Sequence, residues 1–382
     1  MNIYVVQAGD SVSSIAAAFG LSPEEIIYLN QVAEPYGLAL GQALLLPTGG
    51  GEGAIFERPF FSFGYAYPFI DESVLQESLS YLSGLAVFSY GFSAEGELVP
   101  PQLPDEPLVA AALAAGSRSI LTLTPFGPDG NFNNYLVSAA LNDAAARQRL
   151  LAELLATAQA KGYLGVDVDF EYILPEDRQA FSAFVQELAD LLHSQGLTLS
   201  VALAPKTYAE QPGLLYEGQD YAALGAAADY VLLMTYEWGY TYSEPMPIAP
   251  LNWVRRVLEY AVQEIPPDKI TLGIPNYAYD WTLPYVRGES RARTLGVVDA
   301  MQQAIDVGVE ILFDEVAQTP YYNYVQDGQE HQVWFEDVRS LAARFQLINE
   351  FGLLGGGWWQ LMRLFRAGWR LLIGSFYITK NL

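Results

Sequence analysis

The sequence predicts an α/β protein: a (β/α)8 TIM barrel with a small inserted α+β subdomain, preceded by a compact β-α-α-β unit. Over most of the 382 residues, apolar strand-like runs alternate with helical stretches, a pattern typical of parallel strands covered by helices. Eight such runs follow one another, the number of strands in a barrel of about 250 residues. A separate unit precedes them, divided from them by a glycine-rich segment.

The composition favours a well-packed and strongly acidic protein. Hydrophobic residues make up 51% and charged residues 16%, which allows a large core. The net charge of −25 argues against nucleic acid and anionic membranes as partners. There is no cysteine, and His193 and His331 are not spaced as metal ligands. We therefore expect no metal and no cofactor.

Residues 1–48 are expected to form the N-terminal unit. A short strand at 3–7 leads into a helix at 12–19, for which Asp10 or Ser11 can supply the cap. Ser22-Pro23-Glu24-Glu25 opens a second helix, with serine at the cap, proline at the first helical position and glutamate two residues further on. A second strand follows at 43–47.

This unit resembles the lysin-motif (LysM) domain in residues 4–15, 29–30 and 41–47. The resemblance implies a module that binds glycans containing N-acetylglucosamine, in a groove between the loops around residues 9–12 and 30–38. The residues implied for that groove are Gly9, Asp10, Ser11, Val12 and Asn30. The alternative is a packing module without a sugar site. Since one copy is present, weak affinity is expected in the absence of avidity.

A glycine-rich linker is expected at residues 49–57 and the barrel at 58–382. The expected strands are residues 60–67, 85–92, 119–124, 163–173, 197–204, 230–236, 269–275 and 352–359. The last two strands are too far apart for a single crossover. Residues 281–337 are therefore expected to form the inserted subdomain, standing over the C-terminal ends of the strands, where barrel active sites lie.

The fourth strand, at 163–173, alternates apolar and acidic side chains. Asp167, Asp169 and Glu171 fall on one face of it. Crowded carboxylates repel one another, so at least one should hold a proton near neutral pH, as glycoside hydrolysis requires. The alternative is an antiparallel strand with its acidic face in water. Helices expected on both sides of the run favour the covered, parallel strand.

Residues 165–171 are similar to the signature of glycoside hydrolase family 18, Asp-x-x-Asp-x-Asp-x-Glu, and match its last three acids. Further matches fall at other strand ends: Met234-Thr235-Tyr236, Gly273-Ile274-Pro275 followed by Tyr277, and Trp359. The resemblance covers about residues 58–382. Together with the LysM unit, it is greatest to bacterial spore cortical-fragment-lytic enzymes, which are peptidoglycan N-acetylglucosaminidases.

The resemblance implies a mechanism without a protein nucleophile. Glu171 would be the general acid, and the 2-acetamido oxygen of the substrate would attack the anomeric carbon. Asp169 would orient the acetamido group, Asp167 would share a proton with Asp169, and Tyr236 would donate to the acetamido carbonyl. The residues implied for substrate binding are Trp359, Tyr277, Met234, Glu237 and Tyr65.

Two positions depart from the family pattern. Leu164 stands at the position of the first acid of the signature, where we expect a change of packing rather than loss of activity. Glu237 stands where many members carry aspartate. Beside it, Trp238 and Tyr240 could either stack on sugar or simply pack.

The function that this sequence predicts is retaining hydrolysis of β-1,4-linked N-acetylglucosamine glycans in peptidoglycan, with spore cortex fragments as the substrate. A chitinase would share the chemistry. A glycan-binding lectin without activity is a third hypothesis, against which the presence of Glu171 argues. We expect a monomer bound to peptidoglycan or chitin-type glycan and associated with the spore or cell wall. Because we find no secretory signal, a cytoplasmic location is the alternative.

Overall fold

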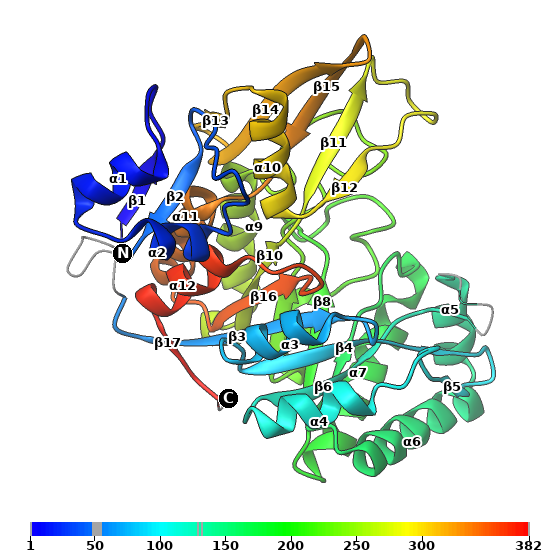
Figure 1. Ribbon diagram of the computed structural model, residues 1–382. Coiled ribbons are helices and arrows are strands. Elements are labelled where there is room, and N and C mark those ends of the chain that lie inside the picture. Colours follow the sequence, from blue (N-terminus) through cyan, green and yellow to red (C-terminus); the bar gives the residue numbers. More distant parts are fainter. Residues whose placement is uncertain (1, 48–55, 128–129, 131–132, 381–382) are drawn as a thin grey trace.

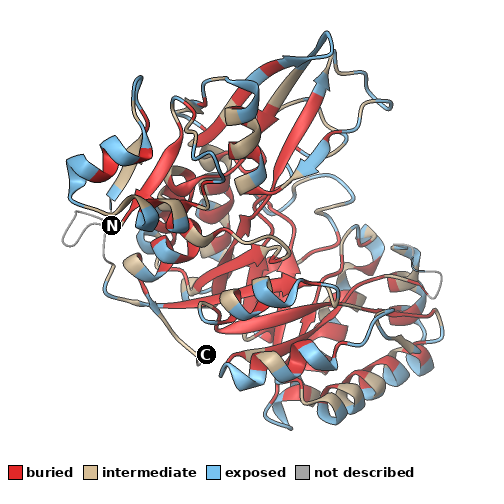
Figure 2. Ribbon diagram, viewed as in Figure 1, coloured by how far each residue is buried: buried red, intermediate tan, exposed pale blue. Residues whose placement is uncertain are grey.

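The computed structural model describes residues 2–47, 56–127, 130 and 133–380 (Figure 1). A β-α-α-β unit lies beside a closed barrel, and a second, smaller sheet stands over one side of the barrel. Buried residues are concentrated in the barrel strands and in parts of the smaller sheet, whereas the N-terminal helices keep exposed faces (Figure 2). The fold class predicted from the sequence is confirmed. Most of the expected linker, residues 49–57, lies outside the described residues.

The N-terminal unit has the predicted order of elements. They are β1 (Asn2–Val5), α1 (Val12–Phe19), α2 (Pro23–Asn30) and β2 (Ala43–Leu46). The two strands pair antiparallel. Ser11 caps α1 in a reciprocal capping box with Ser14. Ser22 and Glu25 do the same for α2, with Pro23 at its first position. Side chains therefore satisfy backbone donors at both helix starts, which would otherwise lack partners.

In the described part of the chain, eight parallel strands form the barrel. They are β3 (Pro59–Ala66), β4 (Gly84–Phe92), β6 (Arg118–Leu123), β7 (Gly165–Val168), β8 (Thr198–Leu203), β9 (Tyr230–Leu233), β10 (Ile270–Pro275) and β16 (Gly355–Trp359). The barrel closes because β3 pairs with β4 on one side and with β16 on the other. Two short strands extend it: β5 (Leu98–Val99) pairs with β4, and β17 (Tyr377–Ile378) pairs with β3.

Helices cover the outside of the barrel (Figure 1). They are α3 (Glu72–Leu79), α4 (Glu106–Ala114), α5 (Tyr135–Asn142), α6 (Ala144–Lys161), α7 (Arg178–His193), α8 (Tyr221–Ala227), α9 (Leu251–Glu264), α11 (Val338–Glu350) and α12 (Arg366–Ser375). Short 3-10 turns, Pro175–Asp177 and Pro267–Lys269, precede α7 and β10. No helix within the described ranges is long and apolar enough to cross a membrane.

The smaller sheet belongs to the insertion between β10 and β16. Its elements are β11 (Ala278–Leu283), β12 (Arg293–Leu295), α10 (Val297–Val307), β13 (Leu312–Asp314), β14 (Thr319–Gln326) and β15 (Gln329–Trp334). The strands pair antiparallel in the order β12-β11-β15-β14-β13. The buried Asp280 ties the sheet together, because its carboxylate accepts hydrogen bonds from Tyr324 (2.7 Å), Arg293 (2.8 Å) and Gln303 (3.2 Å).

The acidic strand is shorter than predicted. The ladder of β7 ends at Val168, although the Asp169 N–H still donates to the Leu123 carbonyl (2.9 Å). Tyr172 then adopts a left-handed backbone conformation, with φ +54°. At this end of the barrel the chain leaves the sheet for the loop that precedes α7. Glu171 therefore lies beyond the strand, in the loop that follows it.

Candidate active site

The two faces of the β7 segment separate as the alternation predicts. Phe170 packs against Phe181 and Phe184 of α7, with ring centroids 5.7 and 6.1 Å apart, so the apolar face meets the surrounding helices. Asp169 and Glu171 on the other face line a cavity of about 520 Å³ at the C-terminal ends of the strands. The alternative, an acidic face in open water, is wrong because the strand is central to a closed parallel barrel.

Asp167 lies deepest of the three acids and has no exposed surface. Its two oxygens accept hydrogen bonds from the hydroxyls of Ser200 on β8 (2.6 Å) and Tyr65 on β3 (2.9 Å). Burial raises the pKa of Asp167 from 3.8 to about 6, and the two hydrogen bonds oppose that rise by stabilising the ionised form. Tyr65, predicted to bind substrate, is instead buried here as the partner of Asp167.

Asp169 combines burial with an unused acceptor. The side chain is 8% exposed, and its Oδ1 has no hydrogen-bond partner among the described residues. Burial raises the pKa of Asp169 well above its usual range, and the charges of Glu171 and Asp167 raise it further. A buried carboxyl oxygen without a donor is costly, so this atom suits a ligand that brings an N–H group.

Glu171 is an acid of the cavity whose pKa lies near neutral pH. Burial raises its pKa from 4.5 to about 7, and the charge of Glu237 contributes to the same rise. Because it lines the cavity, the group that holds this proton is positioned to meet a ligand. Crowded acids that retain a proton near neutral pH were predicted from the alternation alone.

Glu237 and two tyrosines form the wall next to Glu171. The Glu237 carboxylate accepts hydrogen bonds from the hydroxyls of Tyr277 and Tyr279, the latter at 3.0 Å. Burial raises the pKa of Glu237, and these hydrogen bonds counteract the rise. The Glu237 backbone has φ +64°, an unusual conformation for a residue other than glycine. Tyr279 lines the cavity, whereas Tyr277, predicted to do so, lies behind it as a partner of Glu237.

The rest of the cavity wall is mostly aromatic. Tyr236, Met234 and Trp359 line it together with Asp169, Glu171 and Glu237. The Trp359 ring packs edge-on against Phe88 and Tyr65, with centroids 4.9 and 5.5 Å apart. The lining residues that the site prediction did not name are Phe88, Thr124, Phe126, Tyr172, Pro205, Leu215, Tyr216 and Tyr279. Most of them follow the C-terminal end of a barrel strand, which is the signal that could have found them.

For Trp238 and Tyr240 the sequence allowed either stacking on sugar or packing within the protein. Both side chains line the cavity. Trp238 also packs edge-on against Trp253 of α9, with ring centroids 6.0 Å apart. Within the described ranges, no three His, Cys, Asp or Glu side chains are placed to hold a metal ion.

The residues expected in the LysM groove divide into two groups. Gly9 and Ser11 are exposed near the turn before α1, and Asp10 beside them accepts hydrogen bonds from the Tyr4 hydroxyl and the Gln7 N–H, both at 2.7 Å. The remaining two, Val12 and Asn30, are buried.

The placement of Asn30 contradicts a direct sugar contact. Its amide donates to the carbonyls of Ile26 (3.0 Å) and Leu45 (2.9 Å) and accepts from the Leu45 N–H (2.7 Å). The two hydrogen bonds with Leu45 join α2 to β2, and the bond to Ile26 lies within α2. Val12 likewise belongs to the small core of the unit. Both residues support the fold of the module from inside.

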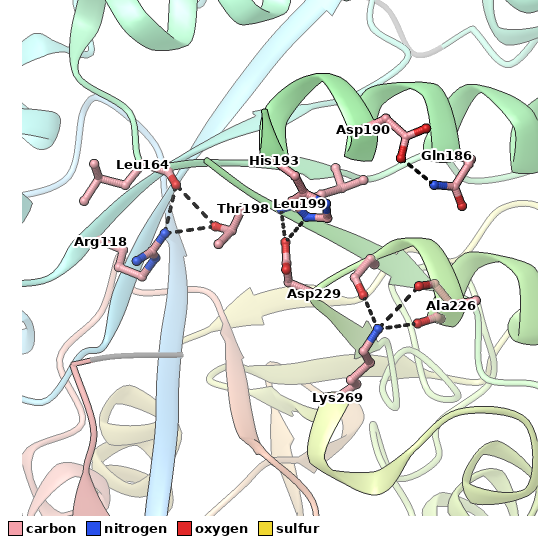
Figure 3. A network of polar contacts seen from close by, with 12 residues as sticks. Arg118, Leu164, Gln186, Asp190, His193, Thr198, Leu199, Ala226, Asp229 and Lys269 are labelled. Atoms are coloured by element: carbon pink, nitrogen blue, oxygen red, sulfur yellow. Dashed lines mark hydrogen bonds and ion pairs between the residues drawn. The ribbon is translucent and has the colours of Figure 1, made fainter. Parts of the chain in front are cut away.

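Leu164 lies one residue before β7, at the opposite end of the barrel from the cavity. Its carbonyl accepts a hydrogen bond from Arg118 (2.9 Å), which also reaches Thr198 (3.2 Å), within a polar network at the starts of the strands (Figure 3). The leucine side chain is 37% exposed. The departure from the family signature thus changes contacts at the N-terminal ends of the strands, away from Asp169 and Glu171.

A TIM barrel that holds a carboxylic acid beside carboxylates in an aromatic cavity past its fourth strand has the architecture of a glycoside hydrolase. Comparison with protein families agrees. The model for glycosyl hydrolases family 18 matches residues 111–363, and the LysM domain model matches residues 4–47. The chain therefore belongs to glycosyl hydrolase family 18 and carries a LysM domain at its N-terminal end.

Several known proteins are similar to this chain over most of its length. The cortical fragment-lytic enzyme of Bacillus subtilis (strain 168) is 36% identical over 431 residues, covering 100% of this chain and 99% of the relative. The crystal structure of the Bacillus cereus spore cortex-lytic enzyme SleL superposes with a TM-score of 0.93 at 32% identity, covering 99% of each chain. A chitinase from Chromobacterium violaceum has a TM-score of 0.76 at 28% identity and covers 83% of this chain and 99% of its own.

Proposed function

We propose that this protein is a retaining glycosidase of the N-acetylglucosaminidase type that cleaves β-1,4-linked glycans of peptidoglycan, with spore cortex fragments as its substrate. The observation that carries the proposal is Glu171, a half-buried acid with a pKa of about 7 in a cavity shared with Asp169, Tyr236 and Trp359. The names of the full-length relatives support cortex fragments as the substrate class.

Glu171 and Asp169 carry the central steps of the proposed mechanism. Protonated Glu171 gives its proton to the glycosidic oxygen as the bond to the anomeric carbon breaks. The acetamido oxygen of the same sugar attacks that carbon and forms an oxazolinium ion. Asp169 accepts the acetamido N–H through the oxygen that has no protein partner. Glu171, now ionised, removes a proton from the water molecule that attacks the anomeric carbon and opens the oxazolinium ring. The configuration at the anomeric carbon is therefore retained.

The neighbouring residues hold this arrangement. The Tyr236 hydroxyl donates a hydrogen bond to the acetamido carbonyl oxygen, and Trp359 forms an apolar floor for the sugar beside Met234. Asp167 lies beneath Asp169, and the two carboxyl groups share one proton. The pair therefore carries one negative charge instead of two in this part of the barrel. Its hydrogen bonds from Tyr65 and Ser200 fix its position.

A Glu171→Gln variant tests the assignment. It should bind N-acetylglucosamine oligomers as the wild type does and release product about 10²–10⁴-fold more slowly, because the glutamine amide has no acidic proton to give to the glycosidic oxygen. Isothermal titration with a chitin oligomer measures binding, and reducing-end release from cortex fragments measures hydrolysis. Undiminished release would refute the assignment. Binding without hydrolysis by the wild-type protein itself would instead favour the lectin hypothesis.

Chitin hydrolysis is the second candidate, favoured by one observation. The cavity-lining residues that the structure describes include no lysine, arginine or histidine, so none of them pairs with the carboxylates of muramic acid or peptide stems. Mass spectrometry of digests of purified peptidoglycan and of chitin separates the two. Preferential release of chitin oligomers would replace peptidoglycan as the proposed substrate.

We propose further that the LysM domain binds the glycan strand and places the protein in the spore or cell wall. The turn at Gly9, Asp10 and Ser11 remains accessible, as do residues 33–36 of the loop on the other side of the expected groove. Sedimentation with insoluble peptidoglycan measures this binding. A Ser11→Ala variant that cosediments as fully as the wild type would argue that this turn does not take part.

A further inference from the structure

The LysM domain is built into the catalytic body through its second strand. All four residues of β2 are buried, although the domain is small. Leu44 and Leu46 face the core of the domain itself. Ala43 and Leu45, which point to the other side of the strand, belong to the core of the barrel. In keeping with this, α2 and β2 contact α11 and α12 (Figure 1).

A polar anchor fixes the same interface. Arg366, the first residue of α12, forms two hydrogen bonds with the Glu77 carboxylate (2.6 and 2.9 Å) and one with the Tyr28 carbonyl (2.8 Å). Its guanidinium lies 4.0 Å from the centre of the Tyr28 ring. The Gln31 amide accepts from the Arg366 N–H (2.7 Å) and donates to the Leu364 carbonyl (3.2 Å).

The domain also contacts the insertion. The Leu40 carbonyl accepts a hydrogen bond from the N–H of Ile311, the residue before β13 (2.8 Å). Next to it, Gly41 has φ +77°, and a Cβ placed on it would lie 2.0 Å from the Ile311 carbonyl oxygen. A Cβ on Gly37 would lie 3.1 Å from a methyl group of Ile305 on α10. Close backbone contact with the insertion therefore requires glycine at position 41.

The insertion in turn forms part of the cavity wall. Tyr279 on β11 lines the cavity, and its hydroxyl donates to Glu237, which stands beside Glu171. The insertion has other ties to the barrel, among them the hydrogen bond from the Trp281 ring to the Ser243 carbonyl (2.7 Å). Loss of the LysM contact should therefore loosen the sheet partially, not release it.

We infer that the LysM domain is a brace that holds the inserted sheet against the cavity, acting through the contact of Leu40 and Gly41 with Ile311. Leu40 and Gly41 are positioning residues, since they reach the cavity only through the insertion. The domain thus has a role in substrate affinity that is separate from any glycan binding of its own. The kinetic part of this inference rests on the proposed function, whereas the structural part does not.

The test compares Gly41→Ala with Gly20→Ala in the full-length chain. Gly20 ends α1 with φ +67°, and a Cβ there would meet nothing within 4 Å. Both variants place alanine in the left-handed backbone conformation and carry the strain that this costs. Only the Cβ of Gly41→Ala would clash with the Ile311 carbonyl oxygen. The substrate is a chromogenic glycoside of N,N′-diacetylchitobiose, which is too short to span the cavity and the LysM turn together.

Gly41→Ala should raise KM roughly three- to ten-fold with little change in kcat. It should also increase amide hydrogen exchange in β11 and β15, whereas Gly20→Ala should match the wild type in both measurements. Equal behaviour of the two variants, or unchanged exchange in Gly41→Ala, would overturn the inference. If Gly41→Ala does not fold, Gly37→Ala carries the same comparison through Ile305. If the wild type does not hydrolyse this substrate, the proposed function is wrong. Hydrogen exchange in β11 and β15 still tests whether the LysM domain holds the inserted sheet in place.

Discussion

Replacing Glu171 by glutamine should stabilise the protein at neutral and alkaline pH. The pKa of Glu171 is about 7 in the folded chain against an ordinary value of 4.5, so the folded state holds the proton more tightly than the unfolded state. The cost to the folded state is absent below pH 4.5, grows as the pH rises from 4.5 to 7, and is complete above 7. Glutamine resembles the protonated acid and avoids this cost.

The size of the effect follows from the two pKa values. One pKa unit corresponds to about 1.4 kcal/mol, so the wild type loses up to about 3 kcal/mol of unfolding free energy at pH 8 relative to Glu171→Gln. For a chain of this size that is a difference in Tm of about 4–6 °C. Near pH 4 the two proteins should melt together. In the same variant, loss of the general acid should lower kcat by about 10²–10⁴-fold.

Thermal unfolding followed by circular dichroism at several pH values between 4 and 8 measures the stability difference. Glu176→Gln is the matched control, because Glu176 is exposed just five residues further along the chain. It should show no comparable trend. A Tm difference for Glu171→Gln that stays constant with pH, or that is largest at pH 4, would refute the assignment of the buried proton to Glu171.

Three further substitutions test the surroundings of the acid. Glu237→Gln removes a charge that raises the pKa of Glu171, so the alkaline limb of the pH–rate profile should move to lower pH; an upward or absent shift would contradict this. Tyr236→Phe should lower kcat about 10²-fold by removing a donor to the acetamido carbonyl, and an effect on KM alone would argue against that role. Asn30→Ala leaves the buried Leu45 N–H without its partner and should lower the unfolding free energy by about 1–3 kcal/mol, measured as a fall in Tm; an unchanged Tm would show that water replaces the amide.

The barrel could be predicted from the sequence because its signals are local. Each strand is a short apolar run between helical stretches, and the alternation at 163–173 fixes which side chains share a face. The capping residues Ser11 and Ser22 mark the helix starts for the same reason. None of these inferences depends on contacts between residues far apart in the sequence.

The errors arose where a distant element decides the outcome. Tyr279 belongs to β11 and Tyr277 lies one residue before that strand, so a spacing of two residues puts them on the same side of an extended chain. Which of them reaches the cavity depends on the position of Glu237, forty residues earlier in the chain. Asn30 ends a helix, and only the course of β2 past it turns its amide inward. Such tertiary contacts leave no local pattern in the sequence.

In the segment from Gln360 to Arg366, too, a distant contact decides the role of a residue. Helix α12 begins only at the last residue of this segment, Arg366. Arg366, one of the two arginines of this segment, lies against Glu77 and the LysM domain. A charged residue in an apolar segment signalled an interface between two parts of the chain, and only the fold identifies its partner.

The acidity of the cavity has a chemical consequence that links fold and proposed function. Three carboxyl groups, on Asp169, Glu171 and Glu237, line a space in which the described wall provides no cation. Their repulsion can therefore be relieved only by hydrogen bonds or by bound protons. Tyr277 and Tyr279 supply hydrogen bonds to Glu237, whereas Asp169 keeps an oxygen without a partner. The repulsion between Asp169 and Glu171 must then be relieved by a bound proton. This keeps Glu171 able to donate a proton near neutral pH and leaves an Asp169 oxygen able to accept a hydrogen bond from an amide N–H.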